Sequence, residues 1–152
     1  MPSVRVTLAS LEEVVRTIIK ELKVPPKNQA LVMALIGELG SGKTTFTQVL
    51  GQELGINQAA IRSPSFVLQK TYPLGPRAAP FTQLIHIDCY RLDTIDELQH
   101  LNWTEIISDP GNLIVVEWAD KIELALPARY LKIEFAVLSD TERLIKWGWS
   151  TQ

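Results

Sequence analysis

The residues with the clearest chemical meaning form a glycine-rich segment at positions 37–44, Gly-Glu-Leu-Gly-Ser-Gly-Lys-Thr. This segment matches G-x-x-x-x-G-K-[ST] at every defined position. In that pattern the glycines let backbone N–H groups turn toward a phosphate, Lys43 reaches the β- and γ-phosphates, and Thr44 presents a hydroxyl to Mg²⁺. The alternative is a glycine turn that precedes Lys-Thr by chance. The flanking sequence favours a phosphate-binding loop, because an apolar run precedes the segment and a helical pattern follows it.

Two carboxylates follow apolar runs further along the chain. Asp88 ends the run Leu-Ile-His-Ile, and Glu117 ends the run Leu-Ile-Val-Val. Ligands of open α/β sheets bind where parallel strands end, so both acids are candidates to hold a magnesium-bound water or to orient an attacking water. Either acid could instead cap a following helix.

Other residues leave two interpretations open. The segment Ser63, Pro64, Ser65 and Phe66 is either a switch-like loop that senses a γ-phosphate or an ordinary Ser-Pro turn. Trp118 is either a core aromatic residue or a lid over a nucleotide. His86 lacks a nearby Cys or second His that would complete a metal site, so we expect it to be a packed or surface residue.

The strands that must position these residues are visible as apolar runs. Residues 30–36 are apolar throughout, which is typical of a central parallel strand covered on both faces. Residues 84–87 and 113–116 predict two more such strands. Apolar residues alternate over 131–137 and again over 145–149, with a turn between, which predicts a C-terminal antiparallel hairpin.

The remaining segments predict helices and a loop. Val4, Val6 and Leu8 alternate as in a short strand, and Ser10 with Glu13 has the spacing of a capping box that opens a helix. A second helix is predicted over 45–54. Residues 73–80, with three prolines, predict an exposed loop. The fold class expected is α/β: a single P-loop NTPase-like domain, residues 1–152, with parallel central strands and added antiparallel strands.

Composition narrows the classes of function. The chain has 15 Lys and Arg against 17 Asp and Glu, a formal charge of −2, which excludes binding of nucleic acid by phosphate neutralisation alone. Cys89 is the single cysteine, so no internal disulfide can form. No signal peptide and no apolar run of membrane-spanning length occurs, and we therefore expect a cytoplasmic protein without a membrane partner.

Four segments together resemble one known family. They are Gly-Glu-Leu-Gly-Ser-Gly-Lys-Thr-Thr-Phe at 37–46, Ser-Pro-Ser-Phe at 63–66, His-Ile-Asp-Cys-Tyr-Arg-Leu at 86–92 and Val-Glu-Trp-Ala-Asp at 116–120. In this order they resemble the TsaE ATPases of bacterial tRNA threonylcarbamoyladenosine biosynthesis. The resemblance implies an ATPase, slow alone, that supports the TsaB and TsaD proteins, with ATP and Mg²⁺ as cofactors, no other stable metal, and tRNA reached only through the complex.

The resemblance also implies roles for single residues. Asp88, Glu117 and Trp118 would be catalytic, Thr44, Glu117 and Asp88 would bind the metal, and residues 63–66 would be the switch-like loop. The adenine would lie around Ser10 and Leu11. The nucleotide-binding residues expected are Leu11, Gly37, Glu38, Leu39, Gly40, Ser41, Gly42, Lys43, Thr44 and Thr45.

The chain departs from the family pattern at several positions, and two other functions remain open. Glu38 stands where Asp is usual, Ser65 where Thr is usual, Asn102 where Gly is usual, and Cys89 where an aliphatic residue is usual; none is a proposed metal ligand. A small-molecule P-loop kinase would need a lid of clustered arginines, which the seven dispersed arginines do not suggest. A nucleotide-gated binding module with negligible turnover is the other alternative.

Overall fold

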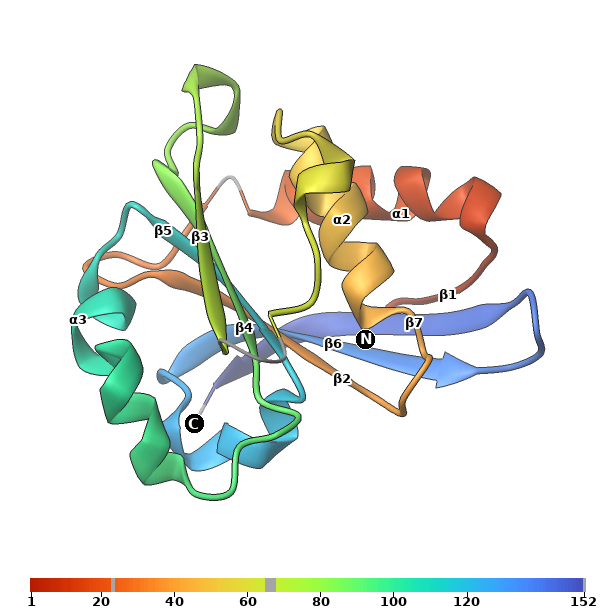
Figure 1. Ribbon diagram of the computed structural model, residues 1–152. Helices are drawn as coiled ribbons and strands as arrows, with labels where there is room; N and C mark the ends of the chain where they lie inside the picture. The colour runs from red at the N-terminus through yellow and green to blue at the C-terminus, as the bar shows by residue number, and fades with distance from the viewer. Residues whose placement is uncertain (23, 65–67, 152) are drawn as a thin grey trace.

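A single mixed sheet organises the molecule (Figure 1). The computed structural model describes residues 1–22, 24–64 and 68–151. Within these residues the seven strands lie in the order β1-β7-β6-β2-β5-β4-β3. Their bounds are β1 (Ser3–Val6), β2 (Leu31–Gly37), β3 (Gln69–Pro73), β4 (Gln83–Asp88), β5 (Asn112–Glu117), β6 (Arg129–Val137) and β7 (Arg143–Thr151).

The centre of the sheet is parallel and its edges are antiparallel. β6, β2, β5 and β4 run parallel to one another, whereas β3, β7 and β1 are added antiparallel. This arrangement confirms the predicted α/β fold with a parallel centre. The C-terminal hairpin is also present, and its first strand is itself part of the parallel centre because β6 pairs with β2.

Helices cover both faces of the sheet, which explains the continuous apolar runs. Along β2, Leu31, Met33 and Leu35 pack on one face, and Val32 and Ala34 pack on the other. The helices α1 (Leu8–Glu21) and α2 (Lys43–Glu53) lie together on the first face, and α3 (Trp103–Ser108) lies on the second (Figure 1). Short 3₁₀ turns complete the chain: η1 (Gln58–Ala60), η2 (Pro76–Ala78), η3 (Ile95–Leu101) and η4 (Ala119–Ala125).

The first helix begins earlier than the sequence predicts. Thr7 is the N-cap residue, its backbone N–H donates to Ser10 Oγ at 2.9 Å, and Leu8 is already helical. Ser10 is thus the third residue of the first turn, and the prediction that it opens the helix was wrong. The pattern was ambiguous because Thr7 and Ser10 are both good capping residues three positions apart.

Elements with little apolar patterning were missed. The edge strand β3 exposes most of its side chains and therefore lacks alternating apolar residues. The predicted loop 73–80 begins where β3 ends and contains η2, whose Ala78 is buried. Among the described residues, no helix has the length and apolar character needed to cross a bilayer.

Candidate functional site

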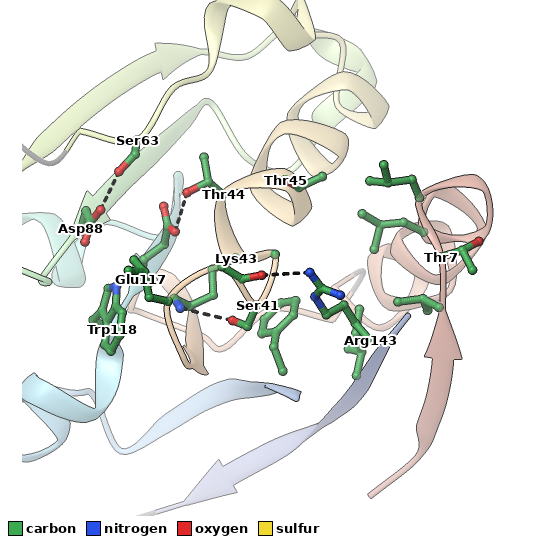
Figure 2. Close-up of a pocket in the computed structure, with 18 of the residues that line it drawn as sticks. Thr7, Ser41, Lys43, Thr44, Thr45, Ser63, Asp88, Glu117, Trp118 and Arg143 are labelled. Atoms are coloured by element: carbon green, nitrogen blue, oxygen red, sulfur yellow. Dashed lines mark hydrogen bonds between the residues drawn. The ribbon is translucent and has the colours of Figure 1, made fainter. Parts of the chain in front are cut away.

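The glycine-rich segment joins β2 to α2 and lines a cavity of about 770 Å³ (Figure 2). Gly40 and Gly42 adopt φ angles of 76° and 103°, in the left-handed region that side chains disfavour. These two glycines allow the chain to curl between the strand and the helix. The cavity is lined by residues 39–45, whereas Gly37, the last residue of β2, and Glu38, which follows it, are not among the lining residues.

Lys43 is held against its own loop. Its Nζ donates to the carbonyl oxygens of Gly37 at 2.6 Å and Glu38 at 2.8 Å, and to Ser41 Oγ at 3.3 Å. Burial lowers the pKa of Lys43, and the carboxylates of Glu117, Asp88 and Asp120 oppose that shift. The residue as a whole is only 5% exposed, so a phosphate that enters the cavity would meet a lysine with little contact to bulk water.

The sheet register places the two predicted acids side by side. β4 and β5 run parallel, and Asp88 is paired with Glu117 at their carboxyl ends. Both side chains are buried. Two acids 29 positions apart in the sequence therefore reach one end of the sheet, beside the start of α2, as the strand-end argument predicts.

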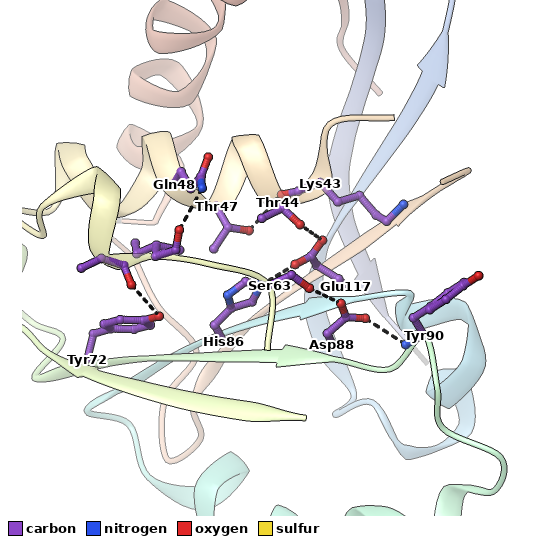
Figure 3. Close-up of polar contacts among 12 residues, drawn as sticks. Lys43, Thr44, Thr47, Gln48, Ser63, Tyr72, His86, Asp88, Tyr90 and Glu117 are labelled. Atoms are coloured by element: carbon purple, nitrogen blue, oxygen red, sulfur yellow. Dashed lines mark hydrogen bonds and ion pairs between the residues drawn. The ribbon is translucent and has the colours of Figure 1, made fainter. Parts of the chain in front are cut away.

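Glu117 is fixed through both carboxylate oxygens (Figure 3). Thr44 Oγ1 donates to Glu117 Oε1 at 2.7 Å, and His86 Nε2 lies 2.5 Å from Glu117 Oε2. Thr44 belongs to α2 and His86 to β4. The carboxylate thus links the start of α2 to the interior of the sheet.

Asp88 links β4 to the predicted switch-like segment. Ser63 Oγ donates to Asp88 Oδ2 at 2.6 Å, and the backbone N–H of Tyr90 donates to Asp88 Oδ1 at 2.9 Å. Ser63 also lines the cavity. Pro64 is buried, and its carbonyl accepts from the backbone N–H of Leu68 at 2.6 Å. Ser65 and Phe66 lie outside the described residues.

Trp118 lies between the core and the cavity. Its ring packs against one core cluster and also lines the cavity. Lys43 Nζ lies 4.2 Å from the ring centroid, a cation–π distance, and the Tyr90 ring lies 5.0 Å away, centroid to centroid. Trp118 holds φ at 59°, which is strained for a residue with a side chain. The indole is therefore part of the wall around Lys43.

The far end of the cavity is more apolar. Leu11 from α1 lines it, together with Phe135 and Ile145 from the hairpin strands. Ser10 is absent from this lining, and its hydroxyl oxygen instead accepts from the backbone N–H of Thr7. Arg143 of β7 donates through Nη2 to the carbonyl oxygen of Gly40 at 3.1 Å, which ties the hairpin to the loop.

The oxygen atoms at the loop suit a magnesium ion held largely by a bound phosphate. Among the described residues, no group of three or more His, Cys, Asp and Glu side chains forms a metal cage. Mg²⁺ is commonly bound through one or two carboxylates plus substrate phosphates and waters. Thr44, Glu117 and Asp88 supply a hydroxyl and two carboxylates of this kind at one cavity. The residues present therefore fit Mg²⁺ that arrives with a nucleotide.

Sequence reasoning missed three residues that the site brings together. His86 is packed, which is one of the two alternatives that the sequence predicts, but its contact with Glu117 was not predicted. A signal was available, since residues 86 and 88 are two apart on a strand and must share a face. Tyr90 and Arg143 gave no comparable signal, because their positions depend on the loop after β4 and on hairpin pairing.

Comparisons with known proteins agree on one family. The model of the family described as "Threonylcarbamoyl adenosine biosynthesis protein TsaE" matches residues 7–145. The chain is 43% identical over 110 residues to the tRNA threonylcarbamoyladenosine biosynthesis protein TsaE of Streptomyces coelicolor, which covers 70% of each chain. It is 31% identical over 138 residues to the protein of the same name from Rickettsia bellii, covering 91% of this chain and 90% of the relative.

A solved structure is similar over nearly the whole chain. The crystal structure of Bacillus subtilis YdiB superposes with a TM-score of 0.66 at 28% sequence identity. The superposition covers 99% of this chain and 86% of that one. The likeness therefore includes the hairpin and the edge strands as well as the parallel centre.

Proposed function

The chain belongs to the TsaE family of tRNA threonylcarbamoyladenosine biosynthesis proteins, and from this premise we propose that it is a Mg²⁺-dependent ATPase. Its ATP hydrolysis would be slow alone and would support the TsaB and TsaD proteins, which act on the tRNA. The observation that supports the proposal best is the convergence of Lys43, Thr44, Asp88 and Glu117 on one cavity. These are a phosphate cation, a hydroxyl and two strand-end carboxylates.

Binding of ATP would exchange the partners of Lys43. The ammonium group would leave the carbonyls of Gly37 and Glu38 for phosphate oxygens, which carry full negative charge. Backbone N–H groups at the start of α2 would face the same phosphates. Thr44, Glu117 and Asp88 would hold Mg²⁺, which would supply positive charge to offset the negative charge of the phosphates.

Glu117 and Asp88 would have different roles at the bound nucleotide. Glu117 accepts a hydrogen bond from the Thr44 hydroxyl, which leaves the lone pairs of that hydroxyl oxygen available to a cation. Asp88 would hold or orient the attacking water, and its contact with Ser63 would let residues 63–66 respond to the γ-phosphate. Trp118 would cover Lys43 until phosphate draws the ammonium group away.

The charge balance bears on how tRNA would be engaged. A net charge of −2 provides no excess of cations for the phosphate backbone. We therefore assign most of the tRNA contact to TsaB and TsaD, with this chain joined to them. The chain would supply a nucleotide-dependent step.

The proposal is tested by ATP turnover of the purified protein, alone and with TsaB and TsaD, in the presence of Mg²⁺. We expect slow turnover alone, faster turnover with both partners, and loss of turnover in Lys43→Ala and Glu117→Ala. Turnover of either variant at the wild-type rate would contradict the site assignment. Failure of the three proteins to associate, with or without ATP, would contradict the partnership.

A further inference from the structure

His86 carries a contact that the proposed function leaves unused. The side chain is fully buried on β4, and its Nε2 lies 2.5 Å from Glu117 Oε2. Its other ring nitrogen, Nδ1, has no hydrogen-bond partner among the described residues. We propose that His86 is a positioning residue: it fixes the Glu117 carboxylate so that Thr44 presents its hydroxyl oxygen to the magnesium of a bound nucleotide. This inference rests on the proposed function.

Two hydrogen-bond partners restrict the Glu117 side chain. A glutamate has three side-chain torsions, so its carboxylate can rotate unless both of its oxygen atoms have hydrogen-bond partners. Here one oxygen meets α2 through Thr44 and the other meets β4 through His86. Glu117 is only 2% exposed, so these two protein partners are the main constraints on its carboxylate.

The orientation of the Glu117 carboxylate determines the direction of the Thr44 hydroxyl. The Thr44 hydroxyl donates to Glu117 Oε1, with 2.7 Å between the two oxygen atoms. No other described residue donates a hydrogen bond to Thr44 Oγ1. If the carboxylate turned, the hydroxyl proton would turn with it, and the lone pairs would point elsewhere. His86 therefore controls the direction of a hydroxyl that it does not touch, through one carboxylate.

The polar atoms of His86 distinguish this role from simple packing. A buried polar atom without a partner is unfavourable, and Nδ1 of His86 is one. An aliphatic side chain would fill the same space without that penalty. The imidazole, unlike an aliphatic side chain, makes the Nε2 contact with Glu117, and this contact offsets the unfavourable burial of Nδ1. Outer partners of metal-binding groups typically alter metal affinity by about 10- to 100-fold when removed.

Two amide variants test the inference because they differ mainly in reach. The amide nitrogen of His86→Gln can take the place of Nε2, whereas that of His86→Asn reaches only as far as Nδ1. Leu84→Ala is the control for loss of packing, since Leu84 is buried two positions earlier on the same face of β4. The readout is the Mg²⁺ concentration at half-maximal binding of a fluorescent ATP analogue, together with binding in EDTA.

We expect His86→Asn to raise that Mg²⁺ concentration at least about tenfold, and His86→Gln to stay within about threefold of wild type. Binding in EDTA should change less than about twofold in both, because Lys43 and the loop are untouched. Leu84→Ala should lower stability without changing the Mg²⁺ response. An equal Mg²⁺ response in the two amide variants would overturn the positioning role.

A spectroscopic measurement on the unaltered protein covers the case in which the variants do not fold. The chain has two histidines, so imidazole ¹⁵N signals can be assigned readily. We expect the His86 Nε2 signal to shift when Mg²⁺ is added to the ATP-bound protein, and the His100 signal to stay in place. No shift at His86 would count against the inference, whereas absence of any ATP binding by the wild type would refute the proposed function instead.

Discussion

Replacement of Asp88 separates the charge of this carboxylate from its hydrogen bonds. Asp88 accepts from Ser63 Oγ at 2.6 Å and from the Tyr90 backbone N–H at 2.9 Å, and it is 5% exposed. In Asp88→Asn the amide oxygen can still accept from Tyr90, and the amide nitrogen can donate to the Ser63 hydroxyl. In Asp88→Ala both partners are lost.

The expected stability changes follow from these contacts. Hydrogen bonds to a charged group contribute about 1.5–3 kcal/mol each, so loss of two sets an upper limit of about 3–6 kcal/mol for Asp88→Ala. Relief of the buried charge offsets part of this loss, and we expect the free energy of unfolding to fall by about 2–4 kcal/mol. Asp88→Asn keeps both contacts in neutral form, and we expect a change of about 1 kcal/mol or less.

Asp88→Asn should lose most of its activity although it keeps most of its stability. The amide is neutral, so it cannot take a proton from water and binds a cation more weakly than a carboxylate; Asp88→Asn should therefore lower the ATP turnover number by about 100-fold or more despite its native-like stability. Urea denaturation and ATP turnover of the same preparations provide both readouts. Asp96→Asn, the same change at an exposed position, is the control. Wild-type turnover in Asp88→Asn would refute the catalytic role of the charge.

Two further predictions concern backbone space and thiol reactivity. A Cβ at Gly37 would lie 2.6 Å from Ser41 Oγ and 2.9 Å from the Phe135 carbonyl oxygen. Gly37→Ala should therefore weaken ATP binding about tenfold or more in calorimetry and lower the free energy of unfolding by about 1–3 kcal/mol in urea denaturation. Gly75→Ala, where a Cβ meets open space, should alter neither quantity. Burial, and then the Asp88 charge, raises the pKa of the Cys89 thiol to about 12, so at pH 8 the folded protein holds about one thiolate per ten thousand molecules. A disulfide reagent should therefore label the thiol only after denaturation, and fast labelling of the folded protein would contradict this burial.

The sequence was sufficient for elements whose burial leaves a continuous or alternating apolar pattern. The strand β2 is covered on both faces, and the hairpin strands alternate, so both were predicted correctly. The convergence of Asp88 and Glu117 also followed from the sequence, because parallel strands share the edge at which they end.

Features that depend on register and on local capping could not be predicted in the same way. The contact between His86 and Glu117 requires knowledge of which strands are neighbours. The start of α1 depended on a choice between Thr7 and Ser10, both of which can cap. The edge strand β3 has no buried face that would leave a pattern in the sequence.

Titration of the protein with ATP by isothermal calorimetry in the presence of Mg²⁺ tests the central claim most directly. We predict one saturable site in the wild type, and binding about ten- to hundredfold weaker in Lys43→Ala, because charge-assisted hydrogen bonds to phosphate are lost. Lys20→Ala, which removes an exposed lysine from the far end of α1, should bind as the wild type does. Absence of binding to the wild type, or equal affinity of Lys43→Ala, would contradict the account.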